Sequence, residues 1–465
     1  MGVIVVSVWS AIVNSNNTAN IEDAFNTKDI TSFAMKNAQI KWLALYFEAE
    51  SSEGKDPCLR LPVTIVNKLY KTIFSEYFAS VDGSQKAFLS DVLERIEKCK
   101  KKAVQYALIG GEVFIKPVIS GKSFDFIPIR RDAFVPFSRD AHGKITSVGS
   151  AEKSSSGGRF YTLLERRTVD NAGTLTIENR LYSSDTEQAI GVQIPLDRLE
   201  RYANLQPEVR IPGVYNLGMV QMRVPVMNTV DGSFDGVAVY DAASGLICNA
   251  NRNEWQLNKE FENGGSRIIA SEDMLKTDER GRKQLSDSLF VALDEDPQNV
   301  GVTIFNPTLR ESSYFAREQN YLRSIENLIG LKRGILSEVE AAERTATEIT
   351  SSAGDYNLTI QDFQNEWTST LKELLSTCVT LGSKFGMTSE GGFDPESDLS
   401  VDWGDGVLFN RDKAWSEISG MVASGLLKPE LALAWYYNEP HDTPEDLQRI
   451  REKYMPEVEA LEDGE

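Results

Sequence analysis

The chain has 465 residues, a length that predicts two to four structural units rather than one core. Its 49 basic and 69 acidic residues give a formal net charge of −20, which excludes a protein that wraps DNA by neutralising phosphates. The two histidines, His142 and His441, leave little material for a histidine-rich metal site or for Ser-His catalysis. The four cysteines are scattered without a CxxC pair, which predicts buried thiols in a reduced, intracellular setting.

The front of the chain is predicted to be mostly helical. Residues 2–13 form an apolar run without the preceding basic residues of a signal peptide, and the run is too short to cross a bilayer. We therefore expect a buried strand or helix there, or an arm that packs on a neighbouring subunit. Apolar residues at helical spacing predict three helices, at residues 29–49, 62–74 and 88–106.

At Gly110-Gly111 the periodicity changes from helical to strand-like. The following segments alternate apolar and polar residues between turns that contain glycine or asparagine, which predicts an antiparallel meander and an α+β fold class. The strands predicted here cover residues 113–117, 124–128, 135–137, 160–164, 174–177 and 180–182.

Two long amphipathic helices then bracket a small α/β insert. A helical pattern returns at Ser233 and stops near residues 264–265, and the second helix follows at Glu311. Its apolar stripe contains Tyr314, Tyr321, Ile325 and Leu328. The opposite, solvated face is predicted to carry Arg317, Glu318, Arg323 and Glu326.

Glycine and basic residues at 330–334 end this helix, and a capping-box spacing at Thr345–Glu348 starts the next one. That helix is expected to continue to Phe385, with a kink or a break near Gly354. A strand at 398–403 and three helices at 413–424, 428–437 and 443–454 follow, and the acidic residues 457–465 are expected to fray. On pattern alone, the stretch from 310 to 356 is more typical of a helical hairpin in an ordinary globular core.

Motifs for catalysis or metal binding find little support in the sequence. Gly121-Lys122-Ser123 resembles the end of a phosphate-binding loop, but Lys116 stands where that loop needs glycine. The acidic pairs 294/296 and 402/405 could hold Mg²⁺, although solvated loops are the simpler interpretation. We predict no catalytic residues, no metal and no cofactor. One basic cluster in the insert is the better candidate for contacting a partner: Arg280, Arg282 and Lys283.

Four segments, in this order, resemble a known family. They are residues 40–46 (IKWLALY), 107–115 (ALIGGEVFI) with the strands after it, 343–349 (ERTATEI), and the C-terminal helical run after Asn410. The chain resembles the portal proteins of tailed bacteriophages, of the kind found in phages of Gram-positive hosts. The resemblance covers essentially the whole length.

The resemblance implies a twelve-fold ring with a central channel at one vertex of the capsid. It also implies an α+β portal fold, divided into a wing at 1–230 and 345–405, stem helices at 231–263 and 309–331, a clip at 264–308, a tunnel loop at 332–344 and a crown at 406–465. The tunnel loop would face DNA with Lys332, Arg333, Ser337, Glu338, Glu340 and Arg344. The stripe residues Tyr314, Tyr321, Ile325 and Leu328 would pack the stem.

A portal would be structural rather than enzymatic. Its implied partners are further copies of itself, double-stranded DNA in the channel, a large terminase ATPase, head-tail adaptors, and the major capsid and scaffolding proteins, with no membrane. It would reside in the virion and assemble in the host cytoplasm. Two alternatives stay open: another minor head protein of a phage or prophage, and a metal-dependent nuclease that uses the acidic clusters.

Overall fold

The computed structural model forms two compact units, Met1–Asp402 and Trp403–Glu465, which are described separately. It describes residues 19–47, 59–264, 267–270, 275–277, 283–285, 302–305, 308–338, 346–389, 391–404, 411–437 and 444–455. The apolar run at 2–13 and the acidic stretch at 457–465 lie outside these ranges. Among the described residues, no helix combines the length and the apolar character needed to span a membrane.

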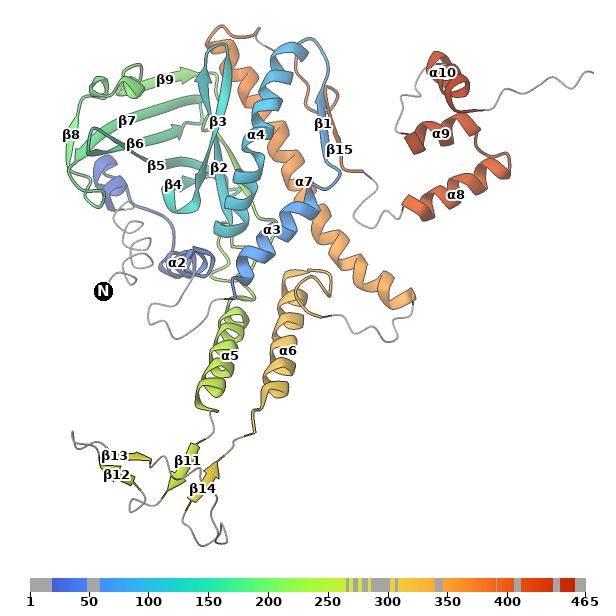
Figure 1. The fold of residues 1–465 in the computed structure, drawn as a ribbon. Coiled ribbons are helices and arrows are strands. Elements are labelled where there is room, and N and C mark those ends of the chain that lie inside the picture. The colour runs from blue at the N-terminus through green and yellow to red at the C-terminus, as the bar shows by residue number, and fades with distance from the viewer. Residues whose placement is uncertain are drawn as a thin grey trace, which may run out of the picture. The chain divides into compact units, whose positions relative to one another are not determined.

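The first unit combines helices with antiparallel sheets (Figure 1). The three helices predicted at the front of the chain are confirmed, with shifted ends. They are α2 (Phe33–Phe47), α3 (Leu61–Ile73) and α4 (Lys86–Gly110). Pro62 stands in the first turn of α3, where a proline costs no helical hydrogen bond. Gly111, in the left-handed conformation, ends α4.

Every strand pairing among the described residues is antiparallel, which confirms the α+β fold class. The largest sheet has the order β4-β5-β6-β7-β8, with β9 also paired to β7. Its strands are β4 (Phe134–Arg139), β5 (Ile145–Ser156), β6 (Arg159–Val169), β7 (Thr174–Ser184), β8 (Val192–Ile194) and β9 (Glu208–Pro212). Two smaller sheets contain β10 (Val220–Arg223), β2 (Glu112–Ser120) and β3 (Ser123–Arg130), and β1 (Phe78–Val81) with β15 (Leu399–Asp402).

The strands predicted separately at 174–177 and 180–182 are one strand, β7. Glu178 and Asn179 continue the ladder and pair with Arg166 and Glu165 of β6. The asparagine amide donates a hydrogen bond to the Gln206 carbonyl at 2.8 Å. A side chain that the sequence suggested for a turn is therefore satisfied by a neighbouring loop, which lets the strand run on.

The helix predicted from Ser233 begins eleven residues later, at Ser244 (α5, Ser244–Asn263). Before that point the chain is held in turns by α4 and the strand after it. The Val239 N–H donates to the Leu108 carbonyl at 3.0 Å, and Gly236 lies directly against the backbone of Gly111. These tertiary contacts take the backbone groups that a helix would have used, so the local helical pattern is overridden.

A buried ionic cluster fixes the same turn segment to the sheet. Arg131 Nε lies 2.8 Å from Glu112 Oε1, and both side chains are almost completely buried. Asp235 accepts a hydrogen bond from Arg139 Nη2 at 2.5 Å and lies 3.7 Å from Arg131 Nη2. Burial raises the pKa of the Glu112 carboxyl, and the Arg131 charge opposes that rise. The cluster ties β2 and β4 to the chain that leads into α5.

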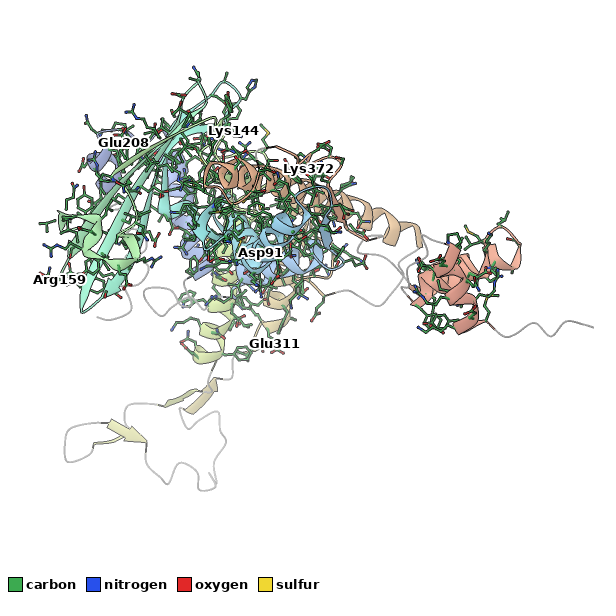
Figure 2. All side chains as sticks on the ribbon, turned by 90° about the horizontal axis from the view of Figure 1, so that it is seen from above. Asp91, Lys144, Arg159, Glu208, Glu311 and Lys372 are labelled. Atoms are coloured by element: carbon green, nitrogen blue, oxygen red, sulfur yellow. The ribbon has the colours of Figure 1, made fainter. Side chains whose placement is uncertain are left out.

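Helix α7 (Ala346–Lys384) has 39 residues and is continuous, so the break expected near Gly354 does not occur. At 1.5 Å per residue it is about 58 Å long. Its core face includes Phe363, Trp367 and Leu371. Surface ion pairs flank it, among them Lys144 with Glu373 at 2.6 Å, and Lys144 and Lys372 are labelled in Figure 2.

The described residues of the second unit form three helices: α8 (Arg411–Ala423), α9 (Pro429–Tyr437) and α10 (Pro444–Tyr454). All three were predicted, with ends that differ by up to two residues. Stacked aromatic rings join them, with the Tyr437 and Tyr454 centroids 4.1 Å apart. Arg451 of α10 donates to the Glu430 carboxylate of α9 at 2.7 Å.

Candidate functional site

Helices α5 and α6 (Glu311–Ile329) lie side by side and run in opposite directions (Figure 1). Asn253 Nδ2 donates to the Tyr314 carbonyl at 3.0 Å, and Arg317 Nη1 donates to Gln256 Oε1 at 3.3 Å. The strand that follows α5, β11 (Arg267–Ala270), pairs antiparallel with the strand that precedes α6, β14 (Val302–Phe305). The chain therefore leaves the α/β body through α5 and β11 and returns to it through β14 and α6, and each outgoing element is paired with a returning one.

One carboxylate joins the two helices where they meet these strands. Glu260 accepts hydrogen bonds from the Arg310 backbone N–H at 3.0 Å and from the Arg310 guanidinium at 2.9 and 2.6 Å. It also accepts one from the Tyr314 hydroxyl at 3.0 Å. The Arg310 hydrogen bonds lower the pKa of Glu260 to about 2. Glu260, Arg310 and Tyr314 form part of the lining of a groove of about 860 Å³ along the helix pair.

The predicted packing stripe of α6 is divided between buried and exposed positions. Ile325 is fully buried, Tyr314 and Tyr321 are half-buried, and Leu328 is 53% exposed. Two further large apolar side chains on the helix pair are exposed, Phe315 at 55% and Phe261 at 47%. The pair therefore presents apolar surface that the described part of the chain leaves uncovered.

Glu326 corrects the prediction of a solvated face, because its side chain is fully buried. Three backbone N–H groups donate to its Oε1, at 3.1, 2.6 and 3.0 Å: those of Gly334, Leu336 and Ser337. Its Oε2 accepts from the Ser337 hydroxyl at 2.7 Å. A carboxylate is one of the few side chains that can accept so many bonds at once, which explains how these four hydrogen bonds satisfy it.

The segment after α6 turns back along the helix because of these bonds. Gly330, in the left-handed conformation at φ 74°, ends α6, and the Leu331 N–H donates to the Glu326 carbonyl at 2.8 Å. About two helical turns before Glu326, Gln319 Oε1 accepts a hydrogen bond from the Glu338 N–H at 2.8 Å. Residues 331–338 are thus held against one face of α6.

Lys332 and Arg333 lie at the bend of this segment. Arg333 is exposed, Lys332 is half-buried, and the Ile335 N–H closes a turn onto the Lys332 carbonyl at 3.3 Å. Of the other loop candidates, Ser337 is buried and Glu338 is exposed, whereas Glu340 and Arg344 lie outside the described residues. The structure therefore brings two of the six candidates together in one basic turn, with Arg333 exposed and Lys332 half-buried.

The clip candidates are only partly described. Lys283 begins β13 (Lys283–Leu285), whose backbone pairs with β12 (Leu275–Thr277), while Arg280 and Arg282 lie outside the described residues. Within the part of the chain that the structure describes, no group of three or more His, Cys, Asp and Glu side chains could hold a metal ion.

The described site is thus an antiparallel helix pair rooted in an α/β body, with paired strands at its far end and a basic turn after its second helix. A sequence model of one family matches residues 61–456, and its description is "Phage portal protein, SPP1 Gp6-like". The chain belongs to this family of phage portal proteins, which confirms the resemblance seen in its sequence. Portal proteins are structural as a family.

A search of curated proteins finds no match. Among solved structures, the chain is similar to one titled "Neck of native GTA particle computed with C12 symmetry", with 11% sequence identity and a TM-score of 0.46. The alignment covers 90% of this chain and 98% of that one.

Proposed function

We propose that copies of this chain form a ring at one vertex of a tailed-phage capsid and that DNA passes through the ring during packaging and ejection. The family match across residues 61–456, which includes the helix pair and the strands between its helices, carries the proposal. The ring resides in the virion after assembly in the host cytoplasm.

The described elements suggest roles for the parts of the chain. The α/β body with α7 forms the wing, α5 and α6 form the stem, β11–β14 belong to the clip, and α8–α10 form the crown. The clip, with Arg280, Arg282 and Lys283, contacts head-tail adaptors or the large terminase. Capsid and scaffolding proteins meet the outside of the ring. Because the chain has no phosphate-binding loop, the terminase supplies the energy for DNA movement.

The exposed apolar residues on the helix pair favour self-assembly. Phe261, Phe315 and Leu328 are large side chains that a monomer leaves in water. Burial of such side chains in a subunit interface would remove apolar surface from water, which is favourable. We expect the stem helices of neighbouring copies to cover these residues, in part through the groove beside Arg310 and Tyr314.

The charge of the chain suits a channel through which DNA slides. With a formal net charge of −20, the ring gains little from counterion release and does not bind DNA tightly. The basic turn at Lys332 and Arg333 supplies local phosphate contacts. Few contacts of this kind guide the duplex without holding it.

Light scattering and negative-stain microscopy of the purified protein test the ring. We expect particles of about a dozen 51.8 kDa chains with a central hole. The double variant Phe315→Gln/Leu328→Gln should keep the monomer fold and lose the rings, whereas Phe385→Gln, at an exposed position after α7, should keep them. A uniform monomer or dimer, with scaffolding protein present, would favour another minor head protein instead.

DNA packaging by assembled particles tests the basic turn. The double variant Lys332→Ala/Arg333→Ala should change the amount of DNA packaged or retained, while Lys428→Ala/Arg449→Ala, which removes two cations from the second unit, serves as a charge-matched control. Unchanged packaging in the double variant would remove the turn from the mechanism without affecting the ring.

A further inference from the structure

The buried carboxylate of Glu326 does more than end a helix. Its side chain and its backbone carbonyl together accept five hydrogen bonds from the segment that follows α6. All five donors lie within residues 331–337. A single residue of α6 therefore organises most of the backbone of that segment.

These bonds enclose the basic turn from both sides. The Leu331 N–H, immediately before Lys332, donates to the Glu326 carbonyl, and the Gly334 N–H, immediately after Arg333, donates to the Glu326 carboxylate. Lys332 and Arg333 are the two residues between these attachment points. Their backbone can move relative to α6 only if at least one of these bonds breaks.

We propose that Glu326 is a positioning residue that fixes the turn carrying Lys332 and Arg333 to α6, so that the two cations move with the helix. The proposal rests on the proposed function in one respect: it gives these cations a defined position from which to meet DNA. Glu326 itself, being fully buried, does not touch the DNA.

The chemistry of the site favours a carboxylate. An apolar side chain of similar length would leave the buried Ser337 N–H and the partly buried Gly334 and Leu336 N–H groups without this acceptor, which is costly for the buried one above all. A glutamine would keep one acceptor oxygen for the N–H groups and could donate to the Ser337 hydroxyl. Its bonds would be weaker, because hydrogen bonds to an ionised acceptor are about twice as strong as neutral ones. The variants Glu326→Met and Glu326→Gln therefore form a graded series.

Amide hydrogen exchange on the full-length protein measures the attachment. We expect the amides of Gly334, Leu336 and Ser337 to exchange at least about tenfold faster in Glu326→Met than in the wild type. Glu326→Gln should accelerate them less. Ser337→Ala, which removes one donor of the five, should have the smallest effect. Trypsin cleavage after Lys332 and Arg333 should accelerate in the same order, because a protease needs a locally opened chain.

Glu311→Gln is the matched control. Glu311 is an exposed glutamate in the first turn of the same helix and is labelled in Figure 2. Its substitution should leave both the amide exchange and the trypsin cleavage unchanged. If Glu326→Met fails to fold, Glu326→Gln carries the test. Wild-type exchange rates at the three amides in a folded Glu326→Gln protein, together with wild-type trypsin cleavage, would overturn the proposal.

A packaging assay separates this proposal from the role of the turn in DNA contact. If Glu326 acts through the turn, Glu326→Gln should alter packaging when it is the only substitution. It should cause no further packaging defect when it is added to Lys332→Ala/Arg333→Ala. An additional defect in the combined variant would show that Glu326 acts elsewhere. If the double variant packages normally while exchange at the three amides still accelerates in Glu326→Gln, the attachment stands and only the DNA contact fails.

Discussion

The two ends of the α5–α6 pair are held by different kinds of contact. At the end next to the α/β body, Trp42 Nε1 donates to Asp241 Oδ1 at 2.7 Å, and the Tyr240 hydroxyl donates to the Trp42 carbonyl at 2.9 Å. Trp42 and Tyr240 are completely buried. At the other end Glu260 and Arg310 form an ion pair, and the arginine side chain is 71% exposed.

This difference between the two ends indicates which of them responds to salt and pH. The hydrogen bonds and the backbone packing at the near end are buried, so salt screens them little. The exposed ion pair at the far end is screened by salt and depends on the charge of one carboxylate. The helix pair is thus fixed at its root and adjustable where it meets β11 and β14.

Gly111→Ala should have the largest effect, because it breaks the fixed end. A Cβ at Gly111 would lie 2.3 Å from the Gly236 carbonyl carbon, and the glycine has a φ of 87°. Gly121→Ala is the matched control, since Gly121 has a φ of 66° with nothing within 4 Å of its Cβ. We expect Gly121→Ala to cost about 1 kcal/mol in unfolding free energy and Gly111→Ala about 3 kcal/mol or more. Equal losses in chemical denaturation would contradict the close backbone contact.

Trp42→Phe should have an intermediate effect. It removes the indole N–H that donates to the Asp241 carboxylate and leaves a small void in a fully buried position. We expect a loss of about 2 kcal/mol in unfolding free energy, in line with a hydrogen bond to a charged group. Trp255→Phe, at a half-buried position on α5, should lose much less. A similar loss for both variants would mean that aromatic area, rather than the hydrogen bond, holds the near end.

Glu260→Gln should have the smallest effect, and one that depends on pH. The folded pKa of about 2 lies below the ordinary value of 4.5, so the ion pair stabilises the fold at neutral pH. This contribution should disappear as the pH falls from about 4.5 to about 2, and it should shrink in about 1 M NaCl. Thermal unfolding of both proteins across that pH range measures it. A difference that is undiminished at pH 2 would show that the ion pair is not its source.

Much of the fold followed from sequence periodicity. The helices at the front, the β2–β3 hairpin and the three C-terminal helices were all predicted, because their apolar residues face a core at a regular spacing. The late start of α5 was not predictable. Residues 233–243 have a helical pattern, and only the contact of Gly236 with the distant Gly111 shows why they form turns.

The candidate site was predicted less well than the fold. The sequence indicated the basic pair Lys332 and Arg333 but assigned Glu326 to the solvated face. One signal was available: Glu326 is four residues after Leu322 and three before Ile329, both of which are buried. A charged residue within an apolar stripe indicates a buried partner, but the partner, the backbone of 334–337, comes from a turn that the pattern alone does not place.

The pairing of β11 with β14 has a mechanical consequence. A tension applied through residues 271–301 pulls on the Ala270–Val302 end of the ladder, and both strands are loaded at the same end. Such a load separates the bonds one after another, as in a zipper, instead of shearing all of them at once. The ladder would therefore yield at a low force, and the Glu260–Arg310 ion pair would be next in line. The far end of the helix pair would therefore open before the buried contacts at the start of α5 carry the load.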